Sequence, residues 1–275
     1  MNPAHGLTVA TIMKLKLYQI DAFTDHLFGG NPAAVIPLKK WLGDELLQQI
    51  AMENQLSETA YIVPSRRKGI DYDIRWFTPM MEIDLCGHAT LASAHVVFSL
   101  LKTKKRKVAF HSQSGLLGVE KGKGQLLMDF PSWEPRRMDA DGEFLKRSLG
   151  VREIVGVYRN RDVLVELPSE KDVAQALPDF SALMKTGDNY ILTAPGTKVD
   201  YVCRFFAPKA GVPEDPVTGS AHVQLIPFWS SRLGKKKMRA EQWSGRKGVL
   251  YCEQKGERVI IGGQCVFYME GTIKL

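Results

Sequence analysis

The sequence predicts an α+β protein made of two similar domains, and three observations support this prediction. Short segments that alternate between apolar and polar residues recur along most of the chain, as strands of antiparallel sheets do. One stretch at residues 87–101, GHATLASAHVVFSLL, is apolar on nearly every side, so a helix of this composition must be buried. Two short motifs occur twice in the same order, and 275 residues are enough for about two domains.

The first half of the chain contains predicted strands around one amphipathic helix and the buried helix. Residues 44–56 have apolar side chains at helical spacing, with Asp44 near the start of the helix. Residues 25–32 form a glycine-rich turn, and residues 108–130 alternate with many glycines, which is typical of an antiparallel meander. The remaining predicted strands of this half are 15–22, 33–37, 60–63 and 71–77.

A linker that starts at a proline, over residues 131–137, marks the predicted domain boundary. We therefore expect one domain at residues 13–130 and a second at residues 131–275, preceded by a detachable or tag-like extension at residues 1–12. The last predicted strands can pair back onto the first domain. Strand-like segments of the second half lie at residues 154–158, 162–166, 190–194 and 201–206, with three more between residues 248 and 273.

The internal repeat consists of two motifs in each half. RWFTP at residues 75–79 matches RFFAP at 204–208, and CGHA at 86–89 matches TGSA at 218–221. The two motifs of the second copy are separated by three more residues than those of the first, and each copy continues into an apolar helix and then a lysine run. This order predicts two domains related by a pseudo-twofold axis, with a cleft between them.

The net charge of +7 comes from two short basic runs, at residues 102–107 and 235–237. Subtracting their eight cations leaves the remainder of the chain at −1. Both runs follow an apolar helical stretch, where cations meet the negative end of the helix dipole. No aromatic residues interleave with the lysines to stack on bases, so we expect no nucleic-acid partner.

Several classes of protein and site lack their usual sequence signals in this chain. No run approaches the roughly 18 apolar residues that a membrane span needs, and residues 1–10 lack a cationic leader pattern, so we expect a cytoplasmic protein without a membrane partner. The spacing of Cys86, Cys203, Cys252 and Cys265 fits no zinc motif, which predicts reduced thiols and no metal. A glycine-rich phosphate loop is also absent from the sequence, so we expect no cofactor.

The two glycines of the repeat predict a site for an anion. If Gly87 and Gly219 each begin a helix, both helices present free backbone N–H groups and the positive end of the helix dipole. Facing each other across a cleft, these ends would bind a small carboxylate without an arginine clamp or a metal. A glycine before a helix is also common in an ordinary tight turn, so the prediction depends on the pair.

Five motifs in the same order resemble the PhzF-like (phenazine biosynthesis protein) family. The resemblance implies a diaminopimelate epimerase-like fold, in which two pseudo-symmetric domains each wrap a sheet around a central helix. It also implies a cofactor-independent isomerase that forms a homodimer, and the best-known member isomerises trans-2,3-dihydro-3-hydroxyanthranilate. The motifs are Asp21-Ala22-Phe23-Thr24, Gly30-Asn31-Pro32, Ser57-Glu58-Thr59-Ala60, Cys86-Gly87-His88-Ala89-Thr90, and the stretch 214–222, EDPVTGSAH.

The resemblance also implies roles for individual residues. Glu58 is similar to the catalytic acid/base of the family, and His88 and Asp215 to its catalytic partners. The predicted substrate-binding residues are Asn31, Gly87, Gly219 and Ser220.

The residue types favour a proton shift over a two-base racemisation. Related epimerases use one cysteine from each half, directly before the glycine, and here these positions are Cys86 and Thr218. A threonine hydroxyl cannot replace a thiolate at neutral pH, whereas a shift along one face of a substrate needs only one carboxyl such as Glu58. We therefore expect general acid/base catalysis on a small carboxylate.

Two other functions stay open on sequence alone. One is a member of the same fold that binds a metabolite or a protein without catalysis. The other is a nucleic-acid-binding protein that uses the two basic runs as one surface. Without the family motif, Glu58 would read as a solvated surface residue and Asn31 as an ordinary turn residue.

Overall fold

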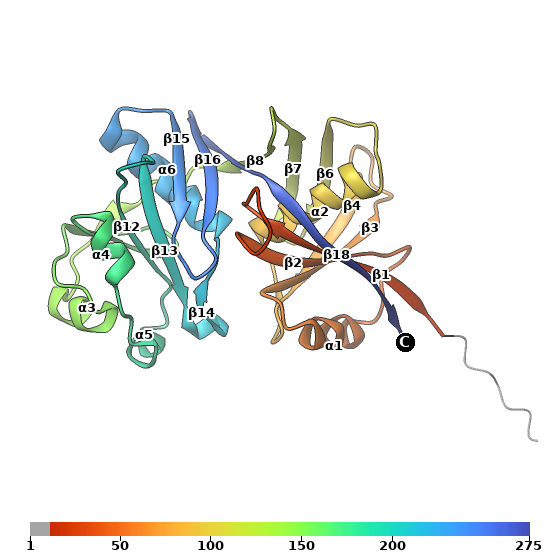
Figure 1. The fold of residues 1–275 in the computed structure, drawn as a ribbon, viewed down its shortest axis with the longest axis horizontal. Helices are drawn as coiled ribbons and strands as arrows, with labels where there is room; N and C mark the ends of the chain where they lie inside the picture. The colour runs from red at the N-terminus through yellow and green to blue at the C-terminus, as the bar shows by residue number, and fades with distance from the viewer. Residues whose placement is uncertain (1–11) are drawn as a thin grey trace, which may run out of the picture.

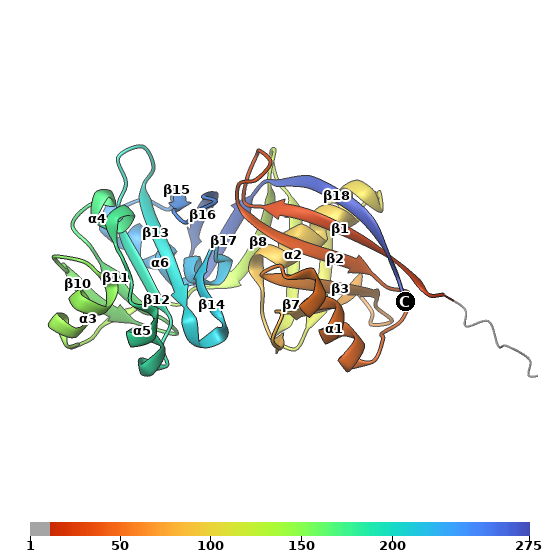
Figure 2. The ribbon, with the colours of Figure 1, turned by 60° about the horizontal axis from the view of Figure 1, so that its bottom comes forward.

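The computed structural model describes residues 12–275, whose 18 strands form one continuous sheet running through two lobes (Figure 1; Figure 2). The extension predicted at residues 1–12 lies, except for Ile12, outside the described residues. Within the described part of the chain, no helix is long and apolar enough to cross a membrane.

The first lobe contains most of the elements before residue 132, together with the last strand of the chain. Its central helix α2 continues into a π-helical turn at Val96–Leu100, so the buried stretch predicted as one helix has two parts. The elements are β1 Lys14–Ala22, β2 Asn31–Pro37, α1 Asp44–Asn54, β3 Glu58–Pro64, β4 Tyr72–Phe77, β5 Glu82–Ile83, α2 Gly87–His95, β6 Lys107–Ser112, β7 Gly115–Lys121, β8 Leu126–Pro131 and β18 Cys265–Lys274.

The second lobe has the same plan around a longer central helix, α6. Three short helices cover its outer side (Figure 2). The elements are β9 Arg136–Arg137, α3 Gly142–Leu149, β10 Gly156–Arg159, β11 Val163–Glu166, α4 Glu170–Gln175, α5 Phe180–Thr186, β12 Tyr190–Pro195, β13 Tyr201–Ala207, a 3-10 turn at Pro208–Ala210, β14 Val212–Asp215, α6 Gly219–Leu233, β15 Lys237–Gln242, β16 Gly248–Lys255 and β17 Arg258–Gly263.

The strand pairing repeats from one lobe to the other. In the first lobe the order β1-β2-β3-β4-β6-β7-β8 has parallel pairs at β2–β3 and β4–β6. In the second lobe the order β10-β11-β12-β13-β15-β16-β17 has parallel pairs at β11–β12 and β13–β15. Helices α2 and α6 occur at the same place in each order, and so do the short strands β5 and β14. This confirms the prediction of an α+β fold with two pseudo-symmetric domains.

One strand pairing and one crossing strand join the lobes into one sheet. Strand β17 pairs with β8, from Arg258 opposite Pro131 to Gly263 opposite Leu126. Strand β18 then crosses back and pairs with β1 along its length (Figure 1). At the far end, Met13 and Leu275 exchange two backbone hydrogen bonds of 2.9 Å. Residues 265–275 therefore lie in the first lobe, although they follow the second in sequence.

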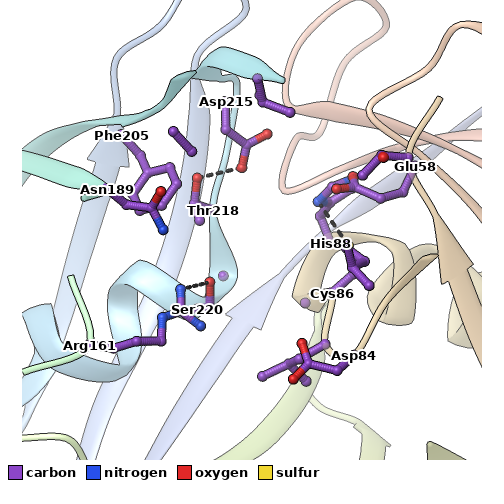
Figure 3. Close-up of a pocket in the computed structure, with 17 residues that line it drawn as sticks. Glu58, Asp84, Cys86, His88, Arg161, Asn189, Phe205, Asp215, Thr218 and Ser220 are labelled. Atoms are coloured by element: carbon purple, nitrogen blue, oxygen red, sulfur yellow. Dashed lines mark hydrogen bonds and ion pairs between the residues drawn. The ribbon is translucent and has the colours of Figure 1, made fainter. Parts of the chain in front are cut away.

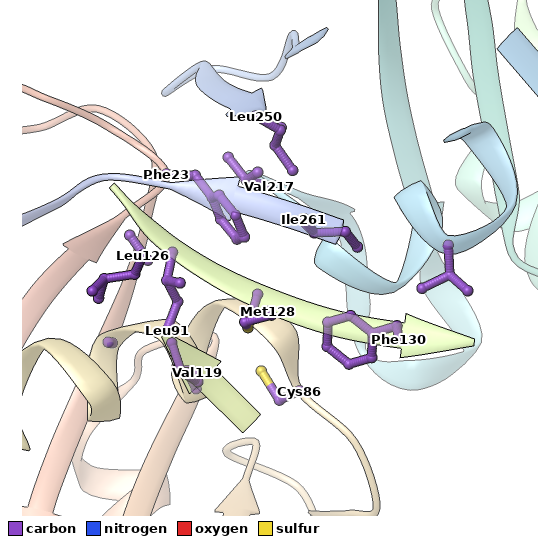
Figure 4. Packing of buried hydrophobic residues seen from close by; sticks show 14 of the residues in the cluster. Phe23, Cys86, Leu91, Val119, Leu126, Met128, Phe130, Val217, Leu250 and Ile261 are labelled. Carbon is purple, nitrogen blue, oxygen red and sulfur yellow. The ribbon is translucent and has the colours of Figure 1, made fainter. Parts of the chain in front are cut away.

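A hydrophobic core runs through the junction between the lobes. Phe23, Leu91 and Met128 of the first lobe share one buried cluster with Val217 and Leu250 of the second (Figure 4). Phe23 is fully buried and packs so closely on Gly263 that a side chain there would collide with its ring. Apolar burial at this junction fixes how the ends of α2 and α6 meet.

Candidate active site

The N-termini of α2 and α6 meet at the junction between the two lobes. A Cβ atom added to Gly87 would lie 3.2 Å from the Cα atom of Gly219, so both positions favour glycine. The residues before them, Cys86 and Thr218, make no side-chain cap hydrogen bond to their helices. The first N–H groups of both helices are thus left for a ligand, together with the positive ends of the two dipoles.

A cavity of about 230 Å³ opens at these helix ends, with walls from both lobes (Figure 3). It includes all but one of the predicted site residues. The lining residues are Glu58, Thr78, Ile83, Asp84, Leu85, Cys86, Gly87, His88, Arg161, Asn189, Phe205, Ala207, Val212, Asp215, Thr218, Gly219 and Ser220.

Glu58 and His88 form an ion pair on the first-lobe wall. Glu58 is the first residue of β3 and His88 the second of α2, and their Oε2 and Nε2 atoms are 2.8 Å apart. The side chains are 11% and 4% exposed. Among the described residues, neither atom has a well-aligned hydrogen-bond partner, so both keep hydrogen-bonding capacity.

Asn31 connects this pair to the second lobe. Its amide group donates to Asp215 Oδ1 at 2.7 Å and to the Val217 carbonyl at 3.0 Å, and lies 3.2 Å from His88 Nδ1. Asn31 is fully buried and is not one of the lining residues of the cavity. The sequence predicts that Asn31 contacts the substrate, whereas the structure places its side chain behind His88 and Asp215, outside the cavity lining.

Asp215 lies at the end of β14 on the second-lobe wall, in a turn fixed by several hydrogen bonds. Its two carboxylate oxygens accept from Asn31 and from the hydroxyl of Thr218. Gln242 donates to the Asp215 carbonyl at 2.9 Å and accepts from the Thr218 N–H at 2.8 Å. Because both carboxylate oxygens face donors, these contacts favour the ionised form of Asp215.

The ionisable groups of the site influence one another. Burial raises the pKa of Asp215 to about 6; the His88 charge lowers it and the Glu58 charge raises it. For His88, burial alone lowers the pKa, but the neighbouring Cys86 and Glu58 raise it well above its usual value. Burial and the Glu58 charge raise the pKa of the Cys86 thiol to about 11, so this thiol is neutral near pH 7. Glu58 is therefore the group that holds a proton on His88.

Strand register shows which residues of the second lobe correspond to these groups. Thr59 pairs with Phe77 as Tyr190 pairs with Phe206, so Asn189 occupies the position of Glu58. The CGHA and TGSA motifs place Ser220 at the position of His88. The second lobe thus has an amide and a hydroxyl where the first has a carboxylate and an imidazole.

Several lining residues were not identified from sequence, among them the polar residues Asp84, Arg161 and Asn189. The sequence predicts an anion site without an arginine, whereas in the structure Arg161 lines the cavity and donates to Ser220 Oγ at 2.9 Å. Its partner is 59 positions away in sequence, so local patterns gave no signal. Aligning the two halves of the repeat by the pairing of their strands would have matched Asn189 to the position of Glu58.

Glu58, Cys86 and His88 are the three described residues whose ligand atoms lie close enough to suggest a metal site, within 4.8 Å of one another. The imidazole, however, lies between the other two groups. Its Nδ1 atom is 3.5 Å from the thiol, and its Nε2 atom is 2.8 Å from the carboxylate. An ion on either ring nitrogen would have one of the other ligands on the opposite side of the ring, so this geometry does not fit a three-ligand metal site.

Comparison with known proteins identifies a matching family model, similar sequences and similar solved structures. The model of the PhzC-PhzF family, described as phenazine biosynthesis-like protein, matches residues 20–271. An uncharacterized isomerase of Pseudomonas aeruginosa is 47% identical over 96% of this chain and 100% of its own length. The crystal structure of a PhzF family protein from Enterococcus faecalis superposes with a TM-score of 0.91 at 45% identity, covering 96% of this chain and 100% of that one. A hydroxyproline epimerase from Agrobacterium vitis shares the fold, with a TM-score of 0.62 at 10% identity over 95% of this chain and 93% of its own.

Proposed function

The chain belongs to the PhzC-PhzF family of phenazine biosynthesis-like proteins, and on this premise we propose that it is a cofactor-independent isomerase of a small carboxylate metabolite. The observation that supports this most is that the Glu58–His88 pair has no acid/base counterpart at the corresponding positions of the opposite wall. The Glu58–His88 pair lies on one wall, while the corresponding positions of the other wall are Asn189 and Ser220. One acid/base group suits a proton shift along a single face of the substrate.

The proposed reaction balances within the substrate. Glu58, as a carboxylate, removes a proton from one carbon, and the electron pair of the broken C–H bond moves into a conjugated system. The Glu58 carboxyl, whose proton exchanges with solvent while the substrate is bound, then delivers a proton to a second carbon on the same face. No electrons leave the substrate, so the step needs no oxidant or reductant.

The other residues assist this transfer. Protonated His88, held 2.8 Å from Glu58, stabilises negative charge that develops on the substrate. Asn31 contacts the imidazole from the first lobe, and Asp215 of the second lobe accepts a hydrogen bond from Asn31 and so fixes its position. The N–H groups at Gly87, Gly219 and Ser220 bind the carboxylate of the substrate, as helix N-termini bind anions.

The test uses trans-2,3-dihydro-3-hydroxyanthranilate in D2O, with isomerisation and deuterium incorporation followed by NMR. We expect turnover with solvent deuterium in the product, and a loss of about 10²- to 10⁴-fold in Glu58→Gln, since this variant removes the acid/base. Glu120→Gln is the matched control, because Glu120 is an exposed residue of β7 outside the cavity.

The alternative is binding without catalysis, and the same samples separate the two. If the substrate binds equally well to the wild type and Glu58→Gln, and no carbon-bound proton exchanges in either, the isomerase proposal fails. If this compound does not bind but other small carboxylates exchange protons in a Glu58-dependent way, the reaction class holds and the substrate differs.

A further inference from the structure

The cavity is rich in acidic groups for a site that is proposed to bind an anion. Its lining includes three carboxylates, Glu58, Asp84 and Asp215, and a single arginine or lysine, Arg161 (Figure 3). Carboxylates repel an anionic substrate, and His88 is already paired with Glu58. Arg161 is therefore the one cation of the described lining whose carboxylate partner, Asp162, is not itself a lining residue.

Arg161 is held in a fixed orientation at the first turn of α6. Its Nε and Nη2 atoms donate to Oδ2 of Asp162 at 3.2 and 3.0 Å, and its guanidinium lies 5.4 Å from the centre of the Trp133 ring. Asp162 is 2% exposed, and its other oxygen accepts from Asn189 at 3.0 Å. A buried carboxylate thus orients two residues that line the cavity.

The guanidinium keeps donors free for a ligand. Nη2 also donates to Ser220 Oγ at 2.9 Å, which leaves the Ser220 hydroxyl hydrogen free to donate elsewhere. Among the described residues, Nη1 makes no hydrogen bond, and the side chain is 38% exposed. The Arg161 fork, the Ser220 hydroxyl and the N-terminus of α6 together form a cluster of donors on the second-lobe wall.

Comparison of the two halves of the repeat shows that this donor cluster has no equivalent in the first lobe. Val163 pairs with Tyr190 as Ala34 pairs with Thr59, so Arg161, two residues earlier, corresponds to Pro32. The first lobe has no cation at the matching place, and its wall has the Glu58 carboxylate instead. The two lobes therefore differ in chemistry, with the acid/base on one wall and the strongest anion donors on the other.

We propose that Arg161 is a specificity-determining residue that binds the carboxylate of the substrate on the second-lobe wall, together with Ser220 and the first turn of α6. The carboxylate is held away from Glu58, so the carbon skeleton is directed toward the acid/base. For the reaction itself this inference rests on the proposed isomerase function. The anion site can be measured without turnover.

Binding of benzoate, a planar monocarboxylate, and of benzamide, its neutral counterpart, measures the charge selectivity of this site. Titrations followed by amide NMR report both affinity and location. We expect the wild type to prefer benzoate, with shifts at Gly219 and Ser220, and Arg161→Gln to lower this preference by about tenfold to a hundredfold. Arg161→Lys should retain part of it, because lysine keeps the charge and loses the fork.

Two further variants control for folding and for charge. Arg161→Gln leaves the Asp162 carboxylate buried without its partner, so Arg161→Gln/Asp162→Asn is measured beside it. Arg258→Gln is the charge control. Arg258 on β17 pairs with Asp129 on β8 at 2.8 Å and lies outside the cavity, so this variant loses one ion-paired cation and should bind benzoate as the wild type does.

The outcomes separate this inference from the proposed function. Benzoate that fails to shift Gly219 and Ser220 in the wild type, or that binds the folded Arg161 variants with unchanged selectivity, overturns the role of Arg161. Selective, Arg161-dependent binding without proton exchange in any tested carboxylate supports the anion site while the isomerase proposal fails.

Discussion

The ionised form of Asp215 is energetically unfavourable in the folded protein. Burial raises its pKa from 3.8 to about 6, with the Glu58 carboxylate adding to the shift. A carboxyl with a raised pKa binds its proton more tightly in the folded protein than in the unfolded chain. Its contribution to stability therefore increases as the pH falls through 6, and at neutral pH its ionised form destabilises the fold.

We predict that Asp215→Asn raises the free energy of unfolding near pH 7.5 while lowering isomerase activity. The amide can accept from Asn31 and donate to Thr218, so the contacts remain and the buried charge is removed. The expected gain is about 1–2 kcal/mol, less than the roughly 3 kcal/mol of the full shift, because Asp215 is only partly buried. Urea unfolding of both proteins measures it.

The pH dependence tests the cause of this gain. The difference between Asp215→Asn and the wild type should shrink as the pH falls from 6 to 4, where the native Asp215 becomes neutral as well. A variant that is less stable than the wild type at pH 7.5 would show that the Asp215 charge is net stabilising in the fold.

Two short strands, β5 and β14, lead into the two helix N-termini, and an arginine on the neighbouring long strand holds each of them. Arg75 on β4 bonds both oxygens of Glu82 at 2.7 and 2.6 Å. Arg204 on β13 bonds both oxygens of Glu214 at 2.8 and 2.9 Å. The residue after Glu82 is Ile83, whereas the residue after Glu214 is Asp215.

This matched pair predicts different effects for equivalent substitutions. Glu214→Gln should lower the free energy of unfolding by about 1–3 kcal/mol, since it leaves the partly buried Arg204 without its anion. Glu82→Gln should cost less, because Arg75 keeps its ion pair with Asp44 at 2.7 Å. Glu214→Gln should also lower kcat/KM by about tenfold or more through displacement of Asp215, and Glu82→Gln should change it little. Equal kinetic losses in the two variants would contradict a positioning role for β14.

Sequence patterns within single elements predict much of this fold. The residues that these patterns fail to identify depend on contacts between elements. The alternation of strands and the apolar stretch at 87–101 are local signals, and the repeat placed Gly87 and Gly219 at the starts of two helices. Family motifs identified Glu58, His88 and Asp215, which the structure brings to one cavity. Arg161 has no such motif, because its role depends on Ser220 and Asp162 being held beside it by the sheet.

At the scale of the whole molecule, the chain closes the first lobe with its own last strand. Strand β1 pairs with β18 on one side and β2 on the other, and β8 lies between β7 and β17. A fragment of residues 13–131 therefore lacks both strands that flank it in the full protein. Unpaired edges and the exposed core around Phe23 should prevent it from folding cooperatively.

We predict that moving the C-terminal strands to the front of this fragment restores folding. Because Met13 and Leu275 bond to each other at 2.9 Å, a flexible linker of about four residues can join residues 258–275 to residues 13–131. The fusion should unfold in a single thermal transition with strand-rich circular dichroism, and the plain fragment should not.

A fusion carrying Gly271→Pro is the control, because Gly271 lies opposite Leu17 at a hydrogen-bonded position of the β1–β18 ladder and proline removes the backbone donor. It should unfold at a lower temperature than the unmodified fusion. If residues 13–131 fold equally well alone, then β17 and β18 add no stability to the first lobe. Their crossing would then serve mainly to hold the two lobes together, with Gly87 against Gly219. The same Gly271→Pro change in the full chain would in that case weaken ligand binding more than stability.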